Sequence, residues 1–245
     1  MREIKDLTVC VKKGGAADAA ESFARRTGAL LSDEPGDGLT LLFERDGVSL
    51  TGFGLSYRGD FTEMLRRLTD GRLQHEMLVH ISKTSVPSPR AVDATAGMGE
   101  DSILFAAAGY DVTMFEQDPV IACLLKDAIR RAKKDKTLAP IVSRMHLVEG
   151  NSIELMPALP FPADLVYLDP MFPERQKSGL IGKKLQLIQK LEMPCFEEEA
   201  LLEAALKTSP GKIVIKRPLK GPYLAGRKPG YTVEGKAIRY DCIVP

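Results

Sequence analysis

The sequence predicts an α/β protein with a doubly wound parallel sheet, preceded by a small α+β unit. Three observations support this. From about residue 90, short apolar runs typical of buried strands alternate with helix-like segments. Glycine-rich or acidic residues directly follow several of these runs, and the first 70 or so residues show a different pattern. A length of 245 residues suits one large domain with an appendage, and we predict units at 1–75 and 76–245.

The N-terminal unit shows the pattern of a helix, a hairpin and a second helix. Ala16–Arg26 is rich in helix-forming residues. Leu39–Phe43 and Val48–Phe53 are β-type runs, and the Asp46-Gly47 pair between them is a hairpin signal. Phe61–Leu68 has apolar residues on one helical face. No motif with recognisable chemistry occurs in this unit.

The larger unit contains five apolar runs that predict parallel strands. They are Ala91–Val92, Val112–Phe115, Met145–Val148, Leu165–Leu168 and Ile213–Ile215. The predicted helices are Asp101–Ala108, Pro119–Lys133 and Phe196–Leu206, and a last strand is predicted at Ile238–Val244. In such sheets the ligand binds beyond the carboxyl ends of the strands, so the residues that follow each run are the candidate site.

Composition excludes several classes of protein. The formal net charge is only +1, so any affinity for nucleic acid must come from a local patch. The four cysteines are scattered, without a CxxC pair, and no histidine lies at metal-ligand spacing. We therefore expect reduced thiols and no metal site. No apolar stretch is long enough for a membrane helix, and the first residues lack the apolar core of a signal peptide, so we expect a cytoplasmic protein.

The first strand leads into a glycine turn, residues 93–101. Gly97 and Gly99 allow a tight turn and a close approach of a ligand to the backbone. Glu100 and Asp101 would repel a pyrophosphate at the following helix, and Ser102 stands where a dinucleotide-binding turn has its third glycine. This disfavours a nicotinamide enzyme and favours a cationic cofactor without phosphate, such as S-adenosylmethionine. The alternative is that both carboxylates only stabilise the helix dipole.

The next two strand ends provide candidate ligands for the rest of that cofactor. Glu116 ends the second strand, where a carboxylate can accept hydrogen bonds from both ribose hydroxyls. The alternative interpretation of Glu116 is a solvated charge at the end of a strand. Asp118 is expected to cap the helix that begins at Pro119. Asn151 and Ser152 follow the third strand, where an adenine edge would lie, although residues of this type also form ordinary turns.

The most specific motif is Asp169-Pro170-Met171-Phe172-Pro173, directly after the fourth strand. It resembles the D/N-P-P-Y/F motif of amino-group methyltransferases. Hydrogen bonds to the Asp169 carboxylate and the Pro170 carbonyl would orient an exocyclic amine for attack on a methyl group. Phe172 would stack on a base taken out of its helix. The alternative is a proline-containing turn with one core phenylalanine.

Basic residues follow the fourth and fifth strands, where they could neutralise phosphates around a flipped nucleotide. Of these, Arg175, Lys177, Lys216 and Arg217 are the predicted substrate contacts. A solvated loop surface is the alternative. The further members of the two groups are Lys183, Lys184, Lys190, Lys220, Arg227 and Lys228.

Together, these motifs resemble the ribosomal RNA small subunit methyltransferase J family. The resemblance rests on residues 92–99, Phe115-Glu116, residues 166–173 with Gln176-Lys177-Ser178, and Lys216-Arg217-Pro218. It implies a Rossmann-like class I methyltransferase fold, S-adenosylmethionine as cofactor, and methylation of guanine N2 near the 3′ end of 16S rRNA.

The resemblance also implies a set of cofactor contacts. They are Glu100, Asp101, Glu116, Gln117, Asn151, Ser152 and Asp169, to which the glycine turn adds Asp93, Gly97 and Gly99. Glu100 and Gln117 stand where the family has basic residues, and Asn151 where it has serine, which implies rearranged hydrogen bonds near the ribose and the methionine tail. Alternatives that remain are an amino-group methyltransferase acting on DNA, another RNA or protein, and a non-catalytic nucleotide-fold binding protein.

Overall fold

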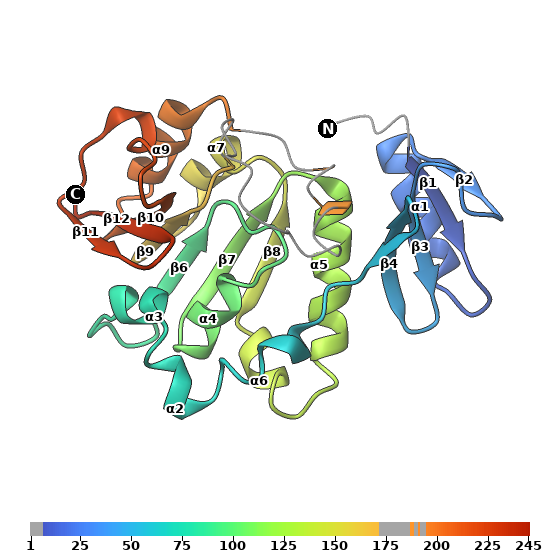
Figure 1. The fold of residues 1–245 in the computed structure, drawn as a ribbon, viewed down its shortest axis with the longest axis horizontal. Helices are drawn as coiled ribbons and strands as arrows, with labels where there is room; N and C mark the ends of the chain where they lie inside the picture. Colours follow the sequence, from blue (N-terminus) through green and yellow to red (C-terminus); the bar gives the residue numbers. More distant parts are fainter. Residues whose placement is uncertain (1–6, 172–186, 189–190, 192–194) are drawn as a thin grey trace.

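The structure is a computed structural model that describes residues 7–171, 187–188, 191 and 195–245. It contains a five-stranded and a seven-stranded sheet, which lie on either side of one long helix, α5 (Figure 1). Within these residues, no helix is both long enough and apolar enough to cross a membrane.

The N-terminal unit is the five-stranded sheet, in the order β2-β1-β3-β4-β5. Its elements are β1 (Leu7–Val11), α1 (Ala17–Thr27), β2 (Leu30–Ser32), β3 (Leu39–Glu44), β4 (Gly47–Gly52) and β5 (Leu55–Tyr57). The predicted helix and hairpin are confirmed, and Glu44 pairs with Gly47 across the turn. The prediction included neither β1, which pairs in parallel with β2 and β3, nor the short strands β2 and β5.

Three short helices connect the two sheets: η1 (Phe61–Met64), α2 (Asp70–Leu73) and α3 (Met77–Ser82). The helix predicted over 61–68 is only a single 3₁₀ segment, in which the Asp60 carboxylate accepts a hydrogen bond from the Thr62 amide. Phe61, Met64 and Leu68 nevertheless bury their side chains in the core of the larger sheet. The domain boundary at residue 75 stays a prediction.

The seven-stranded sheet has the order β11-β12-β10-β9-β6-β7-β8. Its strands are β6 (Arg90–Asp93), β7 (Asp111–Glu116), β8 (Met145–Glu149), β9 (Leu165–Leu168), β10 (Ile213–Pro218), β11 (Tyr231–Glu234) and β12 (Ile238–Ile243). β6 to β10 pair in parallel, whereas β12 is antiparallel to both of its neighbours. The five predicted parallel strands and the last strand are confirmed, and β11 is an addition.

Helices cover both faces of this sheet. They are α4 (Ser102–Ala107), α5 (Pro119–Ala132), α6 (Ala139–Val142), α7 (Ser152–Leu155), η2 (Met156–Ala158), α9 (Glu198–Lys207) and η3 (Leu224–Gly226). The alternation of β9 shows the two layers: Leu165 and Tyr167 enter the core under α4, whereas Val166 and Leu168 enter the core under α9. Because β9 is buried on both faces, all four of its residues are apolar, which explains the continuous hydrophobic run in the sequence.

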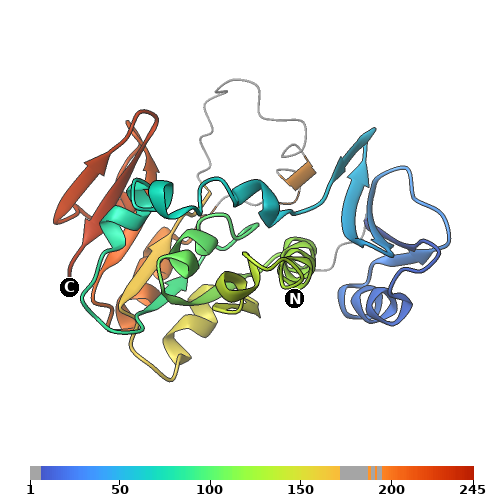
Figure 2. The ribbon, with the colours of Figure 1, turned by 90° about the horizontal axis from the view of Figure 1, so that it is seen from below.

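Helix α5 holds the two units together. Its start is fixed by Asp118, whose carboxylate accepts hydrogen bonds from the amides of Val120 (2.9 Å) and Ile121 (3.1 Å), so the predicted cap is confirmed. Residues on one side of the helix, such as Leu125, pack in the core of the larger sheet, and residues such as Leu124 pack in that of the small sheet. Figure 2 looks nearly along α5 and shows it between the two sheets.

Strand order also determines where a ligand can bind. The chain runs from β6 outward through β7 to β8, and later from β9 outward through β10, so the direction of winding reverses between β6 and β9. In open α/β sheets the crevice at such a reversal is the ligand site. The residues at the carboxyl ends of β6 and β9 are Asp93 and Leu168, followed by the glycine turn and by Asp169.

Candidate functional site

The glycine turn and the Asp169 turn are linked directly by hydrogen bonds. The Asp169 amide donates to the Thr95 hydroxyl (2.7 Å), and the Thr95 amide donates to the Asp93 carboxylate (3.1 Å). Thr95 therefore fixes the backbone of Asp169, the proposed catalytic residue, against the end of β6. The motif comparison did not single out Thr95, because the contact joins positions 74 residues apart.

Gly97 and Gly99 have different reasons to be glycine. Both have positive φ, +53° and +75°, which side chains other than glycine rarely adopt. A Cβ at Gly99 would lie 2.9 Å from Leu125 Cδ1 and 3.3 Å from Phe61 Cζ, so this residue packs tightly against α5 and η1. A Cβ at Gly97 would meet no atom within 4 Å. The backbone of Gly97 therefore faces space that a ligand could fill.

Alanine at these two positions should separate packing from ligand access. We expect Gly99→Ala to lower the free energy of unfolding by about 2–3 kcal/mol, since overpacking adds to the cost of positive φ. Gly97→Ala should lower it by only about 1 kcal/mol, the cost of the backbone conformation alone. Urea unfolding of both variants measures the difference. Equal losses would contradict the tight packing at Gly99.

Asp93 lies beneath the turn and is almost fully buried, with 1% of its surface exposed. Its second carboxylate oxygen accepts a hydrogen bond of 2.6 Å from the Ser102 hydroxyl, at the start of α4. Burial raises the pKa of Asp93 to about 7, against the opposing effect of these hydrogen bonds. Both oxygens thus hold the turn together, and the predicted contact between Asp93 and a cofactor stays a prediction.

Glu116 links the end of β7 to the glycine turn. One of its oxygens accepts a hydrogen bond from the Gly97 amide (2.9 Å), and the other accepts from the Asp118 amide (2.8 Å). The side chain is 9% exposed, and burial raises its pKa to about 7 despite both amide donors. The alternative of a solvated charge is wrong for Glu116. Gln117, the next residue, is exposed beside it.

The raised pKa values predict how stability changes with pH. Glu116 and Asp93 bind protons more tightly in the folded chain, with pKa values of about 7, than their ordinary values of 4.5 and 3.8. At these two groups the folded state therefore holds extra protons between about pH 4 and 7, so their contribution to the free energy of unfolding falls as pH rises through that window. Glu116→Gln should remove about half of this fall, which urea unfolding at pH 5 and pH 8 would measure. An unchanged pH dependence in the variant would contradict the burial effect.

Asn151 and Ser152 lie after β8, as predicted, at the start of α7. The Asn151 side chain accepts a hydrogen bond from the Ile153 amide (3.0 Å), so it caps this short helix. Ser152 is buried. Asn151 therefore has the local structural role that was its alternative interpretation. Contacts of either residue with adenine stay a prediction.

A charged network lies where the ends of β9 and β10 meet the start of α4. The Lys216 ammonium is 2.8 Å from Asp101 Oδ2 and 2.9 Å from Asp169 Oδ2. The Tyr167 hydroxyl donates a hydrogen bond of 2.6 Å to the same Asp101 oxygen. Burial disfavours the ammonium charge, but the two carboxylates outweigh burial and raise the pKa of Lys216. Lys216 is therefore charged at neutral pH and holds two carboxylates together.

Of the two predicted contacts on β10, one needs correction. The Lys216 ammonium is paired with Asp101 and Asp169 inside the crevice, and its contact with the substrate stays a prediction. Arg217 points to the opposite side of the strand and is 1% exposed, with its guanidinium bonded to the Pro222 carbonyl and to Glu198. Side chains alternate along a strand, so two adjacent residues cannot both face the crevice. Phe172, Arg175 and Lys177 lie outside the described residues.

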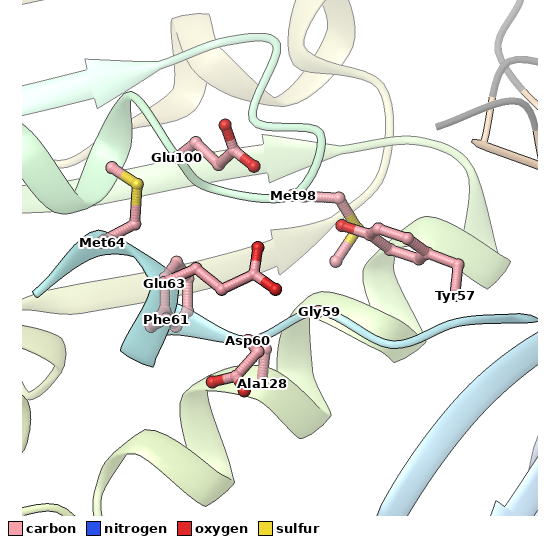
Figure 3. A pocket seen from close by; sticks show the side chains of 9 residues that line it. All are labelled: Tyr57, Gly59, Asp60, Phe61, Glu63, Met64, Met98, Glu100 and Ala128. Carbon is pink, nitrogen blue, oxygen red and sulfur yellow. The ribbon is translucent and has the colours of Figure 1, made fainter. Parts of the chain in front are cut away.

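A cavity of about 180 Å³ lies between the glycine turn, η1 and α5 (Figure 3). Glu100, which was expected to contact the cofactor, lines it together with Met98. The segment before β6 supplies the opposite wall, including Tyr57, Asp60 and Glu63. The sequence pattern gave no signal for this wall, because the packing of residues 57–64 over the turn depends on the placement of α5.

Comparison with known proteins places the chain in a family. The sequence pattern of the family described as "Putative SAM-dependent methyltransferase" matches residues 32–245. A protein of Pseudomonas aeruginosa strain LESB58 called ribosomal RNA small subunit methyltransferase J is 38% identical over 96% of this chain and 93% of its own length. The chain belongs to the ribosomal RNA small subunit methyltransferase J family.

Further members of the J family and a solved structure agree with this. The Pseudomonas fluorescens protein of that name is 39% identical over 93% of this chain and 90% of its own length. A crystal structure of a SAM-dependent methyltransferase from Neisseria gonorrhoeae superimposes with a TM-score of 0.76 and 34% identity, covering 97% of this chain and 96% of that one. Fold, family and S-adenosylmethionine (SAM) as cofactor, all expected from the sequence, are therefore confirmed.

The residues of this J-family chain fit the cofactor. Gly97 faces space in which a Cβ would touch nothing, which leaves room for a ligand against the backbone. Glu116 at the end of β7 presents a carboxylate next to that space, and Glu100 adds a carboxylate just before α4, where Asp101 is already paired with Lys216. Carboxylates in these positions suit a sulfonium and an amine better than a phosphate. Among the residues that the structure describes, no group of side chains could hold a metal ion.

Proposed function

We propose that this methyltransferase transfers the methyl group of SAM to the exocyclic N2 of a guanine in 16S rRNA of the small ribosomal subunit. The observation that carries the proposal is the position of Asp169, an acceptor at the end of β9 whose backbone is bonded to the glycine turn. The names of the J-family relatives point to ribosomal RNA of the small subunit as the substrate.

On this proposal, the cofactor is held by residues at four strand ends. Glu116 would accept the ribose hydroxyls, with Gln117 beside it, and Asn151 and Ser152 would bind the adenine edge. The Glu100 carboxylate would offset the positive charge of the methionine part, and Asp101, paired with Lys216, would lie beside it. Bound SAM supplies an electrophilic methyl group on its sulfonium.

Asp169 orients the nucleophile in this mechanism. Its carboxylate and the Pro170 carbonyl would each accept one N–H of the guanine amine, which turns the nitrogen lone pair toward the methyl group. The network with Lys216 and Asp101 holds the carboxylate in place before the substrate arrives, so little reorganisation is needed. After methyl transfer the extra proton on the amine is lost to solvent or to Asp169.

The RNA would be held by residues around this crevice. Phe172 remains the proposed stacking partner of the flipped base, and Arg175 and Lys177 remain the proposed phosphate contacts. The proposed partner is 16S rRNA, either free or within the small ribosomal subunit, and the proposed location of the reaction is the cytoplasm.

The proposed function is tested by following a labelled methyl group from SAM. Unmodified 16S rRNA and 30S subunits lacking the modification are incubated with the enzyme, digested with nuclease, and analysed as nucleosides. Label in N2-methylguanosine supports cofactor, reaction and base together. Label in another nucleoside refutes the guanine N2 target, and label only in DNA or protein, or in no acceptor, refutes the RNA substrate.

A further inference from the structure

Lys216 presents a donor directly beside the acceptor of the proposed catalytic residue. Its ammonium lies 2.9 Å from Asp169 Oδ2, and the two side chains are 25% and 36% exposed, so a ligand in the crevice can reach both. An ammonium has three N–H donors, and the bonds to Asp101 and Asp169 use two of them. A carboxylate has about four lone-pair sites, so Asp169 can accept bonds from a ligand while it keeps Lys216.

The position of the Lys216 ammonium is fixed by Asp101 and Tyr167. Asp101 holds the ammonium at 2.8 Å, and the buried Tyr167 hydroxyl in turn donates to the same Asp101 oxygen at 2.6 Å. Hydrogen bonds in which the donor or the acceptor is charged are shorter and stronger than neutral ones. The series from Tyr167 through Asp101 therefore orients the lysine before any ligand binds. A flexible surface lysine would lose side-chain entropy on binding, whereas Lys216 has already lost it.

The order of groups in this pair matches one nucleobase edge. The Watson–Crick edge of guanine carries, in sequence, the N2 amine, the N1–H donor and the O6 acceptor. Two acceptors from Asp169 and one donor from Lys216 complement that order. In adenine and cytosine, the ring nitrogen beside the amine has a lone pair instead of a hydrogen, and it would face a carboxylate oxygen. A site whose polar groups are shielded from water by the bound base strongly rejects an analogue that leaves those groups unpaired.

We propose that Lys216 is a specificity-determining residue that donates a hydrogen bond to guanine O6 while Asp169 accepts from N1–H and N2–H. This inference rests on the proposed function and deepens it, because it names the residue that distinguishes guanine from other amino-bearing bases. Lys216 is thus a base-reading residue, in contrast to the phosphate contact that its charge alone predicts.

The test combines a substitution of Lys216 in the enzyme with replacement of guanine O6 by sulfur in the RNA. After the methylated nucleotide has been mapped, subunits are reconstituted with guanosine or 6-thioguanosine at that position, since sulfur is a weaker acceptor and N1–H and N2–H are retained. With the wild-type enzyme we expect 6-thioguanosine to lower kcat/KM about tenfold. Lys216→Met should lower kcat/KM on guanosine by at least as much and make the enzyme insensitive to the sulfur.

Lys212→Met is the matched control, because Lys212 precedes the same strand at its other end and donates to the Ile81 carbonyl. This variant should keep the tenfold preference for oxygen. If Lys216→Met has no measurable turnover, the affinity for both subunit forms in the presence of S-adenosylhomocysteine gives the same ratio. A preference for oxygen that persists in Lys216→Met, or that is missing in the wild type, overturns the inference. Absence of transfer to any guanosine would instead refute the proposed function itself.

Discussion

Asp169→Ala should lower kcat for methyl transfer by about 10²- to 10³-fold, because the variant loses the acceptor that orients the amine. Asp169→Asn keeps one acceptor oxygen, and asparagine occurs in the related motif, so this variant should lose only about tenfold. The change should fall mainly on kcat, since the hydrogen bond to the amine is most important in the transition state. Single-turnover transfer of labelled methyl to 30S subunits measures it.

The control for Asp169 is Asp164, which lies at the opposite end of β9. Its carboxylate accepts a hydrogen bond of 2.8 Å from the Arg90 amide, far from the crevice. Asp164→Ala should therefore cost stability and leave kcat within about twofold of the wild type. Thermal unfolding of each variant shows whether it is folded. Near-normal turnover in Asp169→Ala would refute the orienting role of the carboxylate.

Glu116→Gln should weaken binding of SAM by about 10- to 100-fold, the equivalent of about 1–3 kcal/mol. The amide side chain keeps one acceptor oxygen, but it cannot accept hydrogen bonds from two ribose hydroxyls while bonded to the Gly97 and Asp118 amides. Calorimetric titration with SAM measures the change. Asp111→Asn is the control, because Asp111 begins the strand that Glu116 ends. Equal affinities in Glu116→Gln and Asp111→Asn would refute the ribose contact.

The same titration should depend on pH in the wild type. Burial raises the pKa of Glu116 to about 7, so part of the carboxyl is protonated below that pH and accepts hydrogen bonds less well. Affinity for SAM should therefore increase as pH rises from 6 to 8. Glu116→Gln should be nearly flat over the same range. A wild-type affinity that falls over this range would contradict the assignment of the raised pKa to Glu116.

Most of the larger sheet follows from local sequence. Buried parallel strands need continuous apolar runs, and helices between them need amphipathic or capped segments, so residues 165–168 and the Asp118-Pro119 cap could be identified without contacts. Element ends were less predictable. The segment 61–68 has helical periodicity, but only Phe61–Met64 forms a 3₁₀ segment, although Phe61, Met64 and Leu68 are all buried in the core.

The candidate site was only partly predictable. Strand-end residues such as Glu116 and Asp169 could be located, because in a parallel sheet the carboxyl ends of the strands meet at one edge. Their partners could not be located from local pattern. Thr95 contacts Asp169 across 74 residues, and the Asp101 carboxylate contacts Lys216 across 115. The direction in which Lys216 and Arg217 point also depends on the register of β10 with its neighbours.

The sequence by itself determined the class of fold, the order of the strand-end residues and the family, since these depend on periodicity, turn-forming residues and motifs that local sequence contains. Only the tertiary structure decided how the charges are used. It buries Arg217 and pairs Lys216 with two carboxylates. It also places residues 57–64 against the glycine turn, where they line the cavity. The physical reason is that burial and electrostatic pairing depend on distances between segments far apart in the chain, which folding alone brings together.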